Sequence, residues 1–226
     1  MSRGNKDTMP SLTTTLHLDM LRNRQHGLIG RLRRARDAFR ADKTYGLEWG
    51  DPDCDEPLIY VKKHFLTPYV TPKTTVLEIG PGAGRWTRYL LGARMVYAVD
   101  YHQELLDELA VNFRADNLIA IKNNGTDLPG VPPESIDFVF SFGVFVHLDL
   151  DLIDAYLRSF KSVLKCGGSI VLQYADKTKP MAKLNDGFAE NTPEQMRKLI
   201  LSHGYRIEEE DIGTMWHSSI VRFTTR

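Results

Sequence analysis

The sequence predicts an α/β fold in which a mostly parallel sheet is covered by helices on both faces. From residue 75 onward, short apolar segments alternate with amphipathic ones, and this alternation is typical of parallel strands joined by crossover helices. A glycine-rich turn follows the first of these strands, and the second ends in an acid, Asp100. We therefore expect a Rossmann-like three-layer sandwich, and 226 residues fit one such domain.

The expected elements follow one another with short connections. Asp55 is expected to cap a first helix that has Pro57 in its first turn. The pattern then predicts strands at 75–79, 95–99, 118–122, 136–141, 168–174, 204–210 and 216–224. Helices are expected at 84–91, 102–114, 151–165 and 193–203, with Asp151 capping the third and Asn191 or Thr192 capping the fourth. The last two strands have no helix between them, so they should form a hairpin.

An N-terminal helical extension is expected over residues 1–44, ahead of a domain at 45–226. Residues 18–39 carry apolar side chains at spacings of three and four, while arginines occupy mostly other positions. The apolar stripe can pack on the protein's own body. It can instead contact a second copy of the chain or another protein.

The turn at 80–84 has the pattern Glu-x-Gly-x-Gly-x-Gly, with Glu78, Gly80, Gly82 and Gly84. The dinucleotide fingerprint G-x-G-x-x-G has its third glycine one residue later, so a dehydrogenase is disfavoured. S-adenosylmethionine has no phosphate and offers an amino group, a carboxylate and a sulfonium, which suit an acid just before the turn. A carboxylate at Asp100 can accept hydrogen bonds from both ribose hydroxyls. The pattern therefore favours a pocket for S-adenosylmethionine.

In these motifs the chain resembles the class I S-adenosylmethionine-dependent methyltransferases, over roughly residues 56–224. The resemblance implies seven strands in the order 3-2-1-4-5-7-6, with strand seven antiparallel, and S-adenosylhomocysteine as product. Further residues expected at the cofactor are Tyr45, Trp49, Pro81, Trp86, Tyr101, Asn124, Gly125, Thr126, Ser141 and Phe142.

Two of these assignments leave an alternative open. Asn124 stands where the family often has Asp, so Asp127 can take the adenine-binding role instead. Tyr45 and Trp49 lie in a turn-rich segment, and they can cover the cofactor or fill the core.

His147 is the first candidate for a general base, because it follows the fourth strand near the expected methyl group. A structural histidine bonded to backbone is the alternative. His217 is the second candidate and Asp176, after the fifth strand, the third. Trp216 suits a sugar or aromatic acceptor as well as a core position. No metal site is expected, since helix capping explains the aspartates near His147 better than ligation does.

The totals exclude several classes of protein. Lys plus Arg and Asp plus Glu both number 29, which argues against a general nucleic-acid binder. No apolar run is long enough to cross a bilayer. Cys54 and Cys166 match no metal-ligand spacing, so we expect free thiols and a cytoplasmic protein.

From residue 45 to the C-terminus the chain also looks like methyltransferase domains of bacterial surface-polysaccharide assembly, through segments such as 45–52, 101–106 and 216–219. That resemblance implies O-methylation of a sugar hydroxyl or terminal phosphate of a glycan or glycoside. It also implies a homodimer or a glycosyltransferase partner held through helix 18–39. The alternatives are a methyltransferase for a lipid, quinone or natural product, and a non-catalytic cofactor-binding scaffold.

Overall fold

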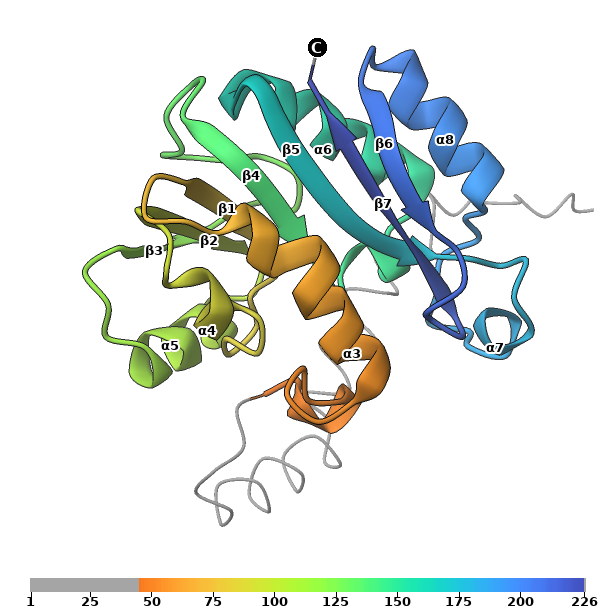
Figure 1. The fold of residues 1–226 in the computed structure, drawn as a ribbon, viewed down its shortest axis with the longest axis horizontal. Helices are drawn as coiled ribbons and strands as arrows, with labels where there is room; N and C mark the ends of the chain where they lie inside the picture. The colour runs from red at the N-terminus through yellow and green to blue at the C-terminus, as the bar shows by residue number, and fades with distance from the viewer. Residues whose placement is uncertain (1–44, 226) are drawn as a thin grey trace, which may run out of the picture. The chain divides into compact units, whose positions relative to one another are not determined.

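The computed structural model describes residues 45–225, which form a seven-stranded sheet between two layers of helices (Figure 1). The strand order is β3-β2-β1-β4-β5-β7-β6, and β7 runs antiparallel to both of its neighbours. The predicted fold class is confirmed. The expected extension at 1–44, with its helix at 18–39, lies outside the described residues.

The parallel strands are β1 (Thr75–Ile79), β2 (Met95–Asp100), β3 (Leu118–Lys122), β4 (Ile136–Ser141) and β5 (Leu164–Ala175). The hairpin strands are β6 (Arg206–Asp211) and β7 (Ser218–Thr224). β1 is the central one of the five parallel strands, with Val76 opposite Val96 of β2 and Phe138 of β4. All five of its residues are buried. A parallel strand covered on both faces is mostly apolar, as Val76, Leu77 and Ile79 are, and Glu78 is the buried exception.

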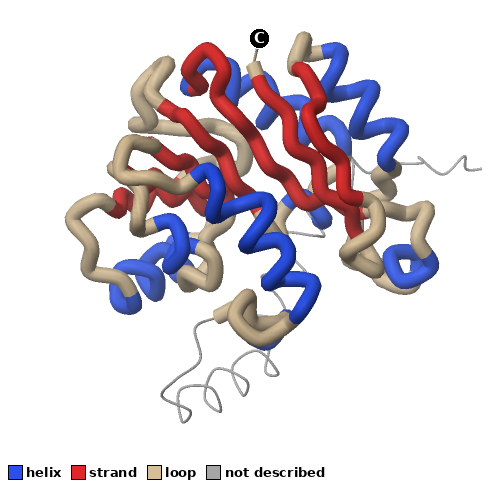
Figure 2. Tube along the Cα trace, in the orientation of Figure 1, coloured by secondary structure: helices blue, strands red, loops and turns tan. Residues whose placement is uncertain are grey.

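The helices divide between the two faces of the sheet (Figure 2). α3 (Glu56–Val61), α4 (Thr87–Leu90) and α5 (Gln103–Asn112) cover one face, and α3 continues through further helical turns to Tyr69. α6 (Leu150–Val163) and α8 (Pro193–Ser202) cover the other, while the short α7 (Pro180–Lys183) follows β5. Alternate strand residues serve the two cores: Val76 packs with Leu58 and Phe65 of the first layer, and Leu77 with Phe160 of α6.

Two of the expected helix starts are wrong, and a third is right in position but lacks the expected side-chain cap. Residue 84 was expected to begin a helix, but α4 begins only at Thr87, because Gly84 has a left-handed backbone. α6 begins at Leu150 with Asp149 at its N-cap, so Asp151 lies inside the first turn. Asp55 does occupy the N-cap of α3, yet its carboxylate accepts from the Asp51 amide.

The start of α8 is as expected, because Thr192 caps it by accepting a hydrogen bond from the Gln195 amide. Asn191 does something else and donates to the carbonyl of Leu148, 2.8 Å away. That contact joins the segment before α8 to the loop after β4.

β5, β6 and β7 begin at residues other than the predicted ones. β5 starts four residues early, because Leu164 pairs with Ile136 before the glycine irregularity at 167–168. β6 starts at Arg206, since Gly204 has a φ of 76° just after α8. β7 starts at Ser218, which leaves residues 216 and 217 outside the strand.

β6 is an edge strand and is strongly acidic. Three of its residues in succession, 208–210, are glutamates, and Asp211 ends it. Arg197 reaches Glu210 at 3.0 Å and Arg222 reaches Glu209 at 3.4 Å. These two arginines therefore balance part of the negative charge of β6.

Within residues 45–225, we find no helix with the length and apolar character that a membrane span requires.

Candidate active site

The centre of the site is the turn after β1, whose three glycines all have a left-handed backbone. The φ angles are 71° at Gly80, 56° at Gly82 and 104° at Gly84. A Cβ on Gly80 would lie 2.0 Å from Cγ2 of Val144, and one on Gly84 would lie 2.1 Å from Cε2 of Phe113. No other residue type fits at Gly80 or Gly84 without displacing a neighbour. The turn therefore presents bare backbone at the carboxyl end of the central strand, where such sheets bind ligands.

Glu78 precedes this turn as a buried acid, with only 2% of its surface exposed. Its Oε2 accepts a hydrogen bond of 2.6 Å from the Thr87 hydroxyl at the start of α4. Burial raises the pKa of Glu78 to about 8, and the Thr87 hydrogen bond opposes that rise only partly. A nearby positive group, such as an ammonium or a sulfonium, would favour the charged carboxylate.

Asp100 ends β2 beside the same turn. Its Oδ2 accepts from the Gly82 amide at 3.4 Å, and its Oδ1 accepts from the His102 amide at 2.8 Å. Burial raises the pKa of Asp100, against the effect of these amides. A carboxylate held in this way is oriented to accept further hydrogen bonds from a ligand lying across the strand ends.

The loop after β3 lies next to Tyr101, as the motif order predicts. A Cβ on Gly125 would lie 3.9 Å from Cδ2 of Tyr101, whose ring is 41% exposed. The Asn124 carboxamide oxygen accepts from the amides of Thr126 and Asp127, while Asp127 accepts from the Asn124 amide. Hydrogen bonds within the loop thus hold its shape, and both candidates for the adenine contact take part in them.

Ser141, Phe142 and Trp86 are turned into the protein. The Ser141 hydroxyl donates to the Ile79 carbonyl at 2.8 Å, tying the ends of β4 and β1 together. Phe142 and Trp86 are both buried, with ring centroids 4.8 Å apart. These three side chains pack inside the protein, underneath the glycine turn. The resemblance implies a direct contact with the cofactor instead.

Residues 45–50 lie against the glycine turn. A Cβ on Gly82 would lie 3.3 Å from the Tyr45 ring, and Trp49 packs edge-on against Tyr45 with a centroid separation of 5.2 Å. Trp49 is 54% exposed and Tyr45 is partly exposed. The alternative of a core position is therefore wrong for Trp49, and the segment has the placement of a cover.

Two of the three candidate bases come together around an aromatic ring. His147, in a helical turn after β4, directs Nδ1 to the Gly187 carbonyl at 2.8 Å. Phe188 lies between the histidines, 5.4 Å from the ring of His147 and 5.2 Å from that of His217. Burial, followed by the charge of Lys179, lowers the pKa of His217. Residues from the loop after β4, the loop before β7 and the segment after β5 thus meet at one place.

Asp176, the third candidate, is occupied with structural contacts. Its Oδ1 accepts from the amide and hydroxyl of Thr178, and its Oδ2 accepts from the Ser219 hydroxyl at 2.6 Å. Lys179 lies 3.7 Å from Oδ2 and donates to two carbonyls of the hairpin. These bonds anchor the segment after β5 to β7, so Asp176 holds the site together.

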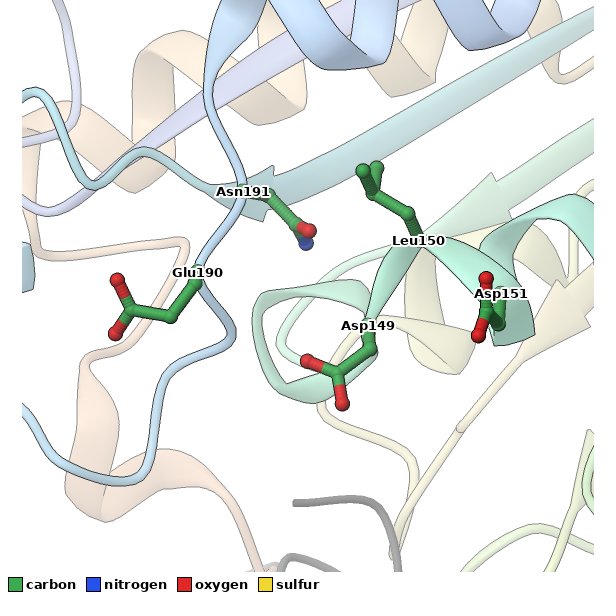
Figure 3. A pocket seen from close by; sticks show the side chains of 5 residues that line it. All are labelled: Asp149, Leu150, Asp151, Glu190 and Asn191. Atoms are coloured by element: carbon green, nitrogen blue, oxygen red, sulfur yellow. The ribbon is translucent and has the colours of Figure 1, made fainter. Parts of the chain in front are cut away.

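Trp216 stands at the rim of this region with 75% of its surface exposed, so a core position is wrong for it. A separate small hollow lies between the start of α6 and the segment before α8 (Figure 3). It is lined by Asp149, Leu150, Asp151, Glu190 and Asn191. None of the residues predicted for the cofactor lines it.

Three side chains at the site were missed from the sequence. Asn123, rather than Asn124, is the buried asparagine, and it donates to the Asp127 carbonyl and to the Tyr156 hydroxyl. Arg85 reaches the carbonyls of residues 46–50. Phe188 separates the two histidines. Only Arg85 carried a local signal, since it directly follows the last glycine of the turn.

Comparison with known proteins agrees with this geometry. Residues 76–168, from β1 into β5, match the family model described as a methyltransferase domain. An S-adenosylmethionine-dependent methyltransferase from Aquifex aeolicus has a similar structure, with a TM-score of 0.57 and 20% identity, over 84% of this chain and 98% of that one. No curated protein matches the sequence.

Two further solved structures share the fold. One is a methyltransferase of Haloferax volcanii in complex with a methyltransferase activator, with a TM-score of 0.66 and 16% identity over 84% of this chain and 95% of that chain. The other is a phosphoethanolamine N-methyltransferase of Haemonchus contortus with phosphoethanolamine and S-adenosylhomocysteine. It has a TM-score of 0.58 and 18% identity, over 73% of this chain and 41% of that one. The domain match and the shared fold confirm the predicted class of enzyme, an S-adenosylmethionine-dependent methyltransferase.

The cost of placing a Cβ against Val144 can be measured by comparing Gly80 with a second glycine that has a similar φ angle. Gly130 has a φ of 74° and open space around its Cβ position, whereas Gly80 combines a φ of 71° with the Val144 contact. Gly80→Ala should lower the free energy of unfolding by about 1–3 kcal/mol more than Gly130→Ala, as overpacking does. Denaturant titration gives both values. Equal losses would show that Val144 moves aside freely.

Glu78 should make the fold less stable as the pH rises. A carboxyl with a higher pKa in the folded than in the unfolded chain stabilises the fold below its unfolded pKa and loses that contribution through its folded pKa. The relevant window is about 4.5 to 8. Glu78→Gln should therefore gain stability relative to wild type as the pH rises from 5 to 8, by at most about 1.4 kcal/mol per pH unit. Denaturant titrations across this range test it, with the exposed Glu56→Gln as control, and a pH-independent difference would contradict it.

Proposed function

We propose that this methyltransferase transfers the methyl group of S-adenosylmethionine to a hydroxyl of a sugar, in a glycan or glycoside. The observation that carries the proposal is the His147–Phe188–His217 cluster beside the exposed Trp216. A hydroxyl acceptor must lose a proton during transfer, and histidine can accept one at neutral pH. The resemblance of residues 45–226 to surface-polysaccharide methyltransferase domains supports a sugar as the acceptor.

The residues around the glycine turn fit the cofactor. The bare backbone at Gly82, the cover formed by Tyr45 and the carboxylate of Asp100 all adjoin the ends of β1 and β2. We assign Asp100 to the ribose hydroxyls, Tyr101 with residues 124–126 to the adenine, and the turn with Glu78 to the methionine part. When bound, the cofactor supplies an activated methyl group, which leaves S-adenosylhomocysteine after transfer.

The orientation of His147 suits a general base. A carbonyl oxygen can only accept, so the hydrogen bond to Gly187 places the proton of the neutral imidazole on Nδ1. Nε2 then carries the lone pair, and it is the atom that takes the proton of the acceptor hydroxyl. Val144, three residues earlier, lies against Gly80, which brings this loop next to the cofactor turn. His217 can take the same role from the opposite side of Phe188.

An acceptor screen tests the proposed reaction. Purified protein with S-adenosylmethionine is offered free sugars, alkyl glycosides and sugar phosphates beside catechols, quinols and amines, and products are analysed by mass spectrometry. We expect a mass gain of one methyl group on a sugar oxygen, together with S-adenosylhomocysteine. Methylation of nitrogen, carbon or a non-sugar hydroxyl alone would contradict the proposal.

Replacing His147 separates the base from the cofactor pocket. His147→Ala should leave the affinity for S-adenosylmethionine within about twofold and slow methyl transfer by roughly 10²–10⁴-fold, the usual contribution of general base catalysis. The exposed His64 also directs its Nδ1 to a carbonyl, so His64→Ala is a matched control expected to keep full turnover. Full activity of His147→Ala, with a slow His217→Ala, would move the role to His217.

A further inference from the structure

Arg85 lies next to the glycine turn and is almost completely buried, with 8% of its surface exposed. Its Nη1 donates to the carbonyls of Gly46, Trp49 and Gly50 at 3.0, 3.3 and 3.5 Å. Its Nη2 points to the other side of the turn, 3.5 Å from the position of a Cβ on Gly143. The guanidinium therefore reaches from residues 45–50 to the loop just after β4, next to the glycine turn.

Among residues 45–225, the positive charge of Arg85 has no bonded negative partner. None of the ion pairs found among residues 45–225 includes Arg85, and all its hydrogen-bond acceptors are neutral carbonyls. Glu48 lies near enough to favour the charged form, but its carboxylate accepts from the Gly46 amide. Asp51 is likewise paired with Arg88. Burial lowers the pKa of Arg85 to about 10, so the side chain stays charged at neutral pH.

A buried cation of this kind is costly unless an anion reaches it. S-adenosylmethionine carries a single anionic group, the carboxylate of its methionine part, while its other two charged groups are positive. Those positive groups suit Glu78, at the opposite end of the same turn. An acid at residue 78, whose charged form a positive group favours, and a cation at residue 85 thus match the two opposite charges of an amino acid.

We propose that Arg85 binds the carboxylate of the cofactor through Nη2 while Nη1 holds residues 45–50 over it. This rests on the proposed function only in requiring that S-adenosylmethionine is the cofactor. Arg85 is then a binding residue that also positions Tyr45 and Trp49. Cofactor binding and closure of the cover depend on one guanidinium.

The test compares two ligands that differ only in this carboxylate. S-adenosylmethionine and its decarboxylated analogue are titrated by calorimetry into wild type, Arg85→Gln, Arg85→Lys and Arg88→Gln. Wild type should bind S-adenosylmethionine roughly 10- to 100-fold more tightly than the analogue, as expected for a charge-assisted hydrogen bond. Arg85→Gln should lose that preference by weakening S-adenosylmethionine alone. Arg85→Lys should keep part of the preference.

Arg88→Gln is the matched control, because it removes an arginine three residues away whose charge is already paired with Asp51 and Asp53. It should preserve the preference for S-adenosylmethionine.

Two outcomes would overturn the assignment. Equal affinities of wild type for the two ligands would do so, and this result does not depend on any variant folding. Equal weakening of both ligands by Arg85→Gln would mean that Arg85 only holds residues 45–50. Failure of wild type to bind S-adenosylmethionine at all would instead overturn the proposed function, and the assignment of Arg85 with it.

Discussion

The close contacts around the glycine turn after β1 are the constraint on which the rest of the site depends. Val144 from the β4 loop packs onto Gly80, and Phe113 from the end of α5 packs onto Gly84. Each neighbour occupies the space that a Cβ would need, so two distant segments are fixed relative to the turn. The ends of β1, β2 and β4 are consequently held close together, and the turn keeps its glycines because a Cβ at Gly80 or Gly84 would displace a neighbour.

Three ionisable side chains around this turn, Glu78, Asp100 and Arg85, are buried. Two acids, Glu78 and Asp100, are buried where water cannot stabilise their charges, and burial raises the pKa of both. Arg85 is also buried beside this turn, and within the described part of the chain it has no acidic hydrogen-bond partner. An enzyme for a cofactor that carries both signs of charge gains from such preorganised groups, because they need no rearrangement when the cofactor arrives. The protein bears the cost of that desolvation in its own stability.

Much of the fold could be predicted because its signals are local. The glycine spacing, Asp100 and the apolar run of β1 all lie within 26 residues, and strand ends in a parallel sheet gather at one edge. The placement of Trp86 and Phe142 could not be predicted, since they are buried by the packing of α4 on the sheet. Gly84 fits a helix start by sequence alone, and only the structure reveals its left-handed backbone and its contact with Phe113.

The cluster of His147, Phe188 and His217 was less predictable, because these residues come from segments that are far apart in the sequence. His147 and His217 are 70 residues apart in sequence, and Phe188 lies between them only because α7 and the segment after it fold back onto the β4 loop. The Ala189 amide donates to the Val146 carbonyl in that fold-back. The residue types of His147 and His217 made them candidate bases from the sequence, whereas their mutual arrangement required the whole sheet.

The acidic edge strand β6 has a consequence for how copies of this enzyme meet. An unpaired strand edge offers backbone groups to any other strand, including the same strand of a second molecule. Two β6 strands side by side would bring two sets of glutamates into contact, and Arg197 and Arg222 already serve the glutamates of their own chain. Sheet extension through this edge is therefore opposed by charge repulsion. The glutamates of β6 thus act against continuous β-structure growing from that side of the molecule.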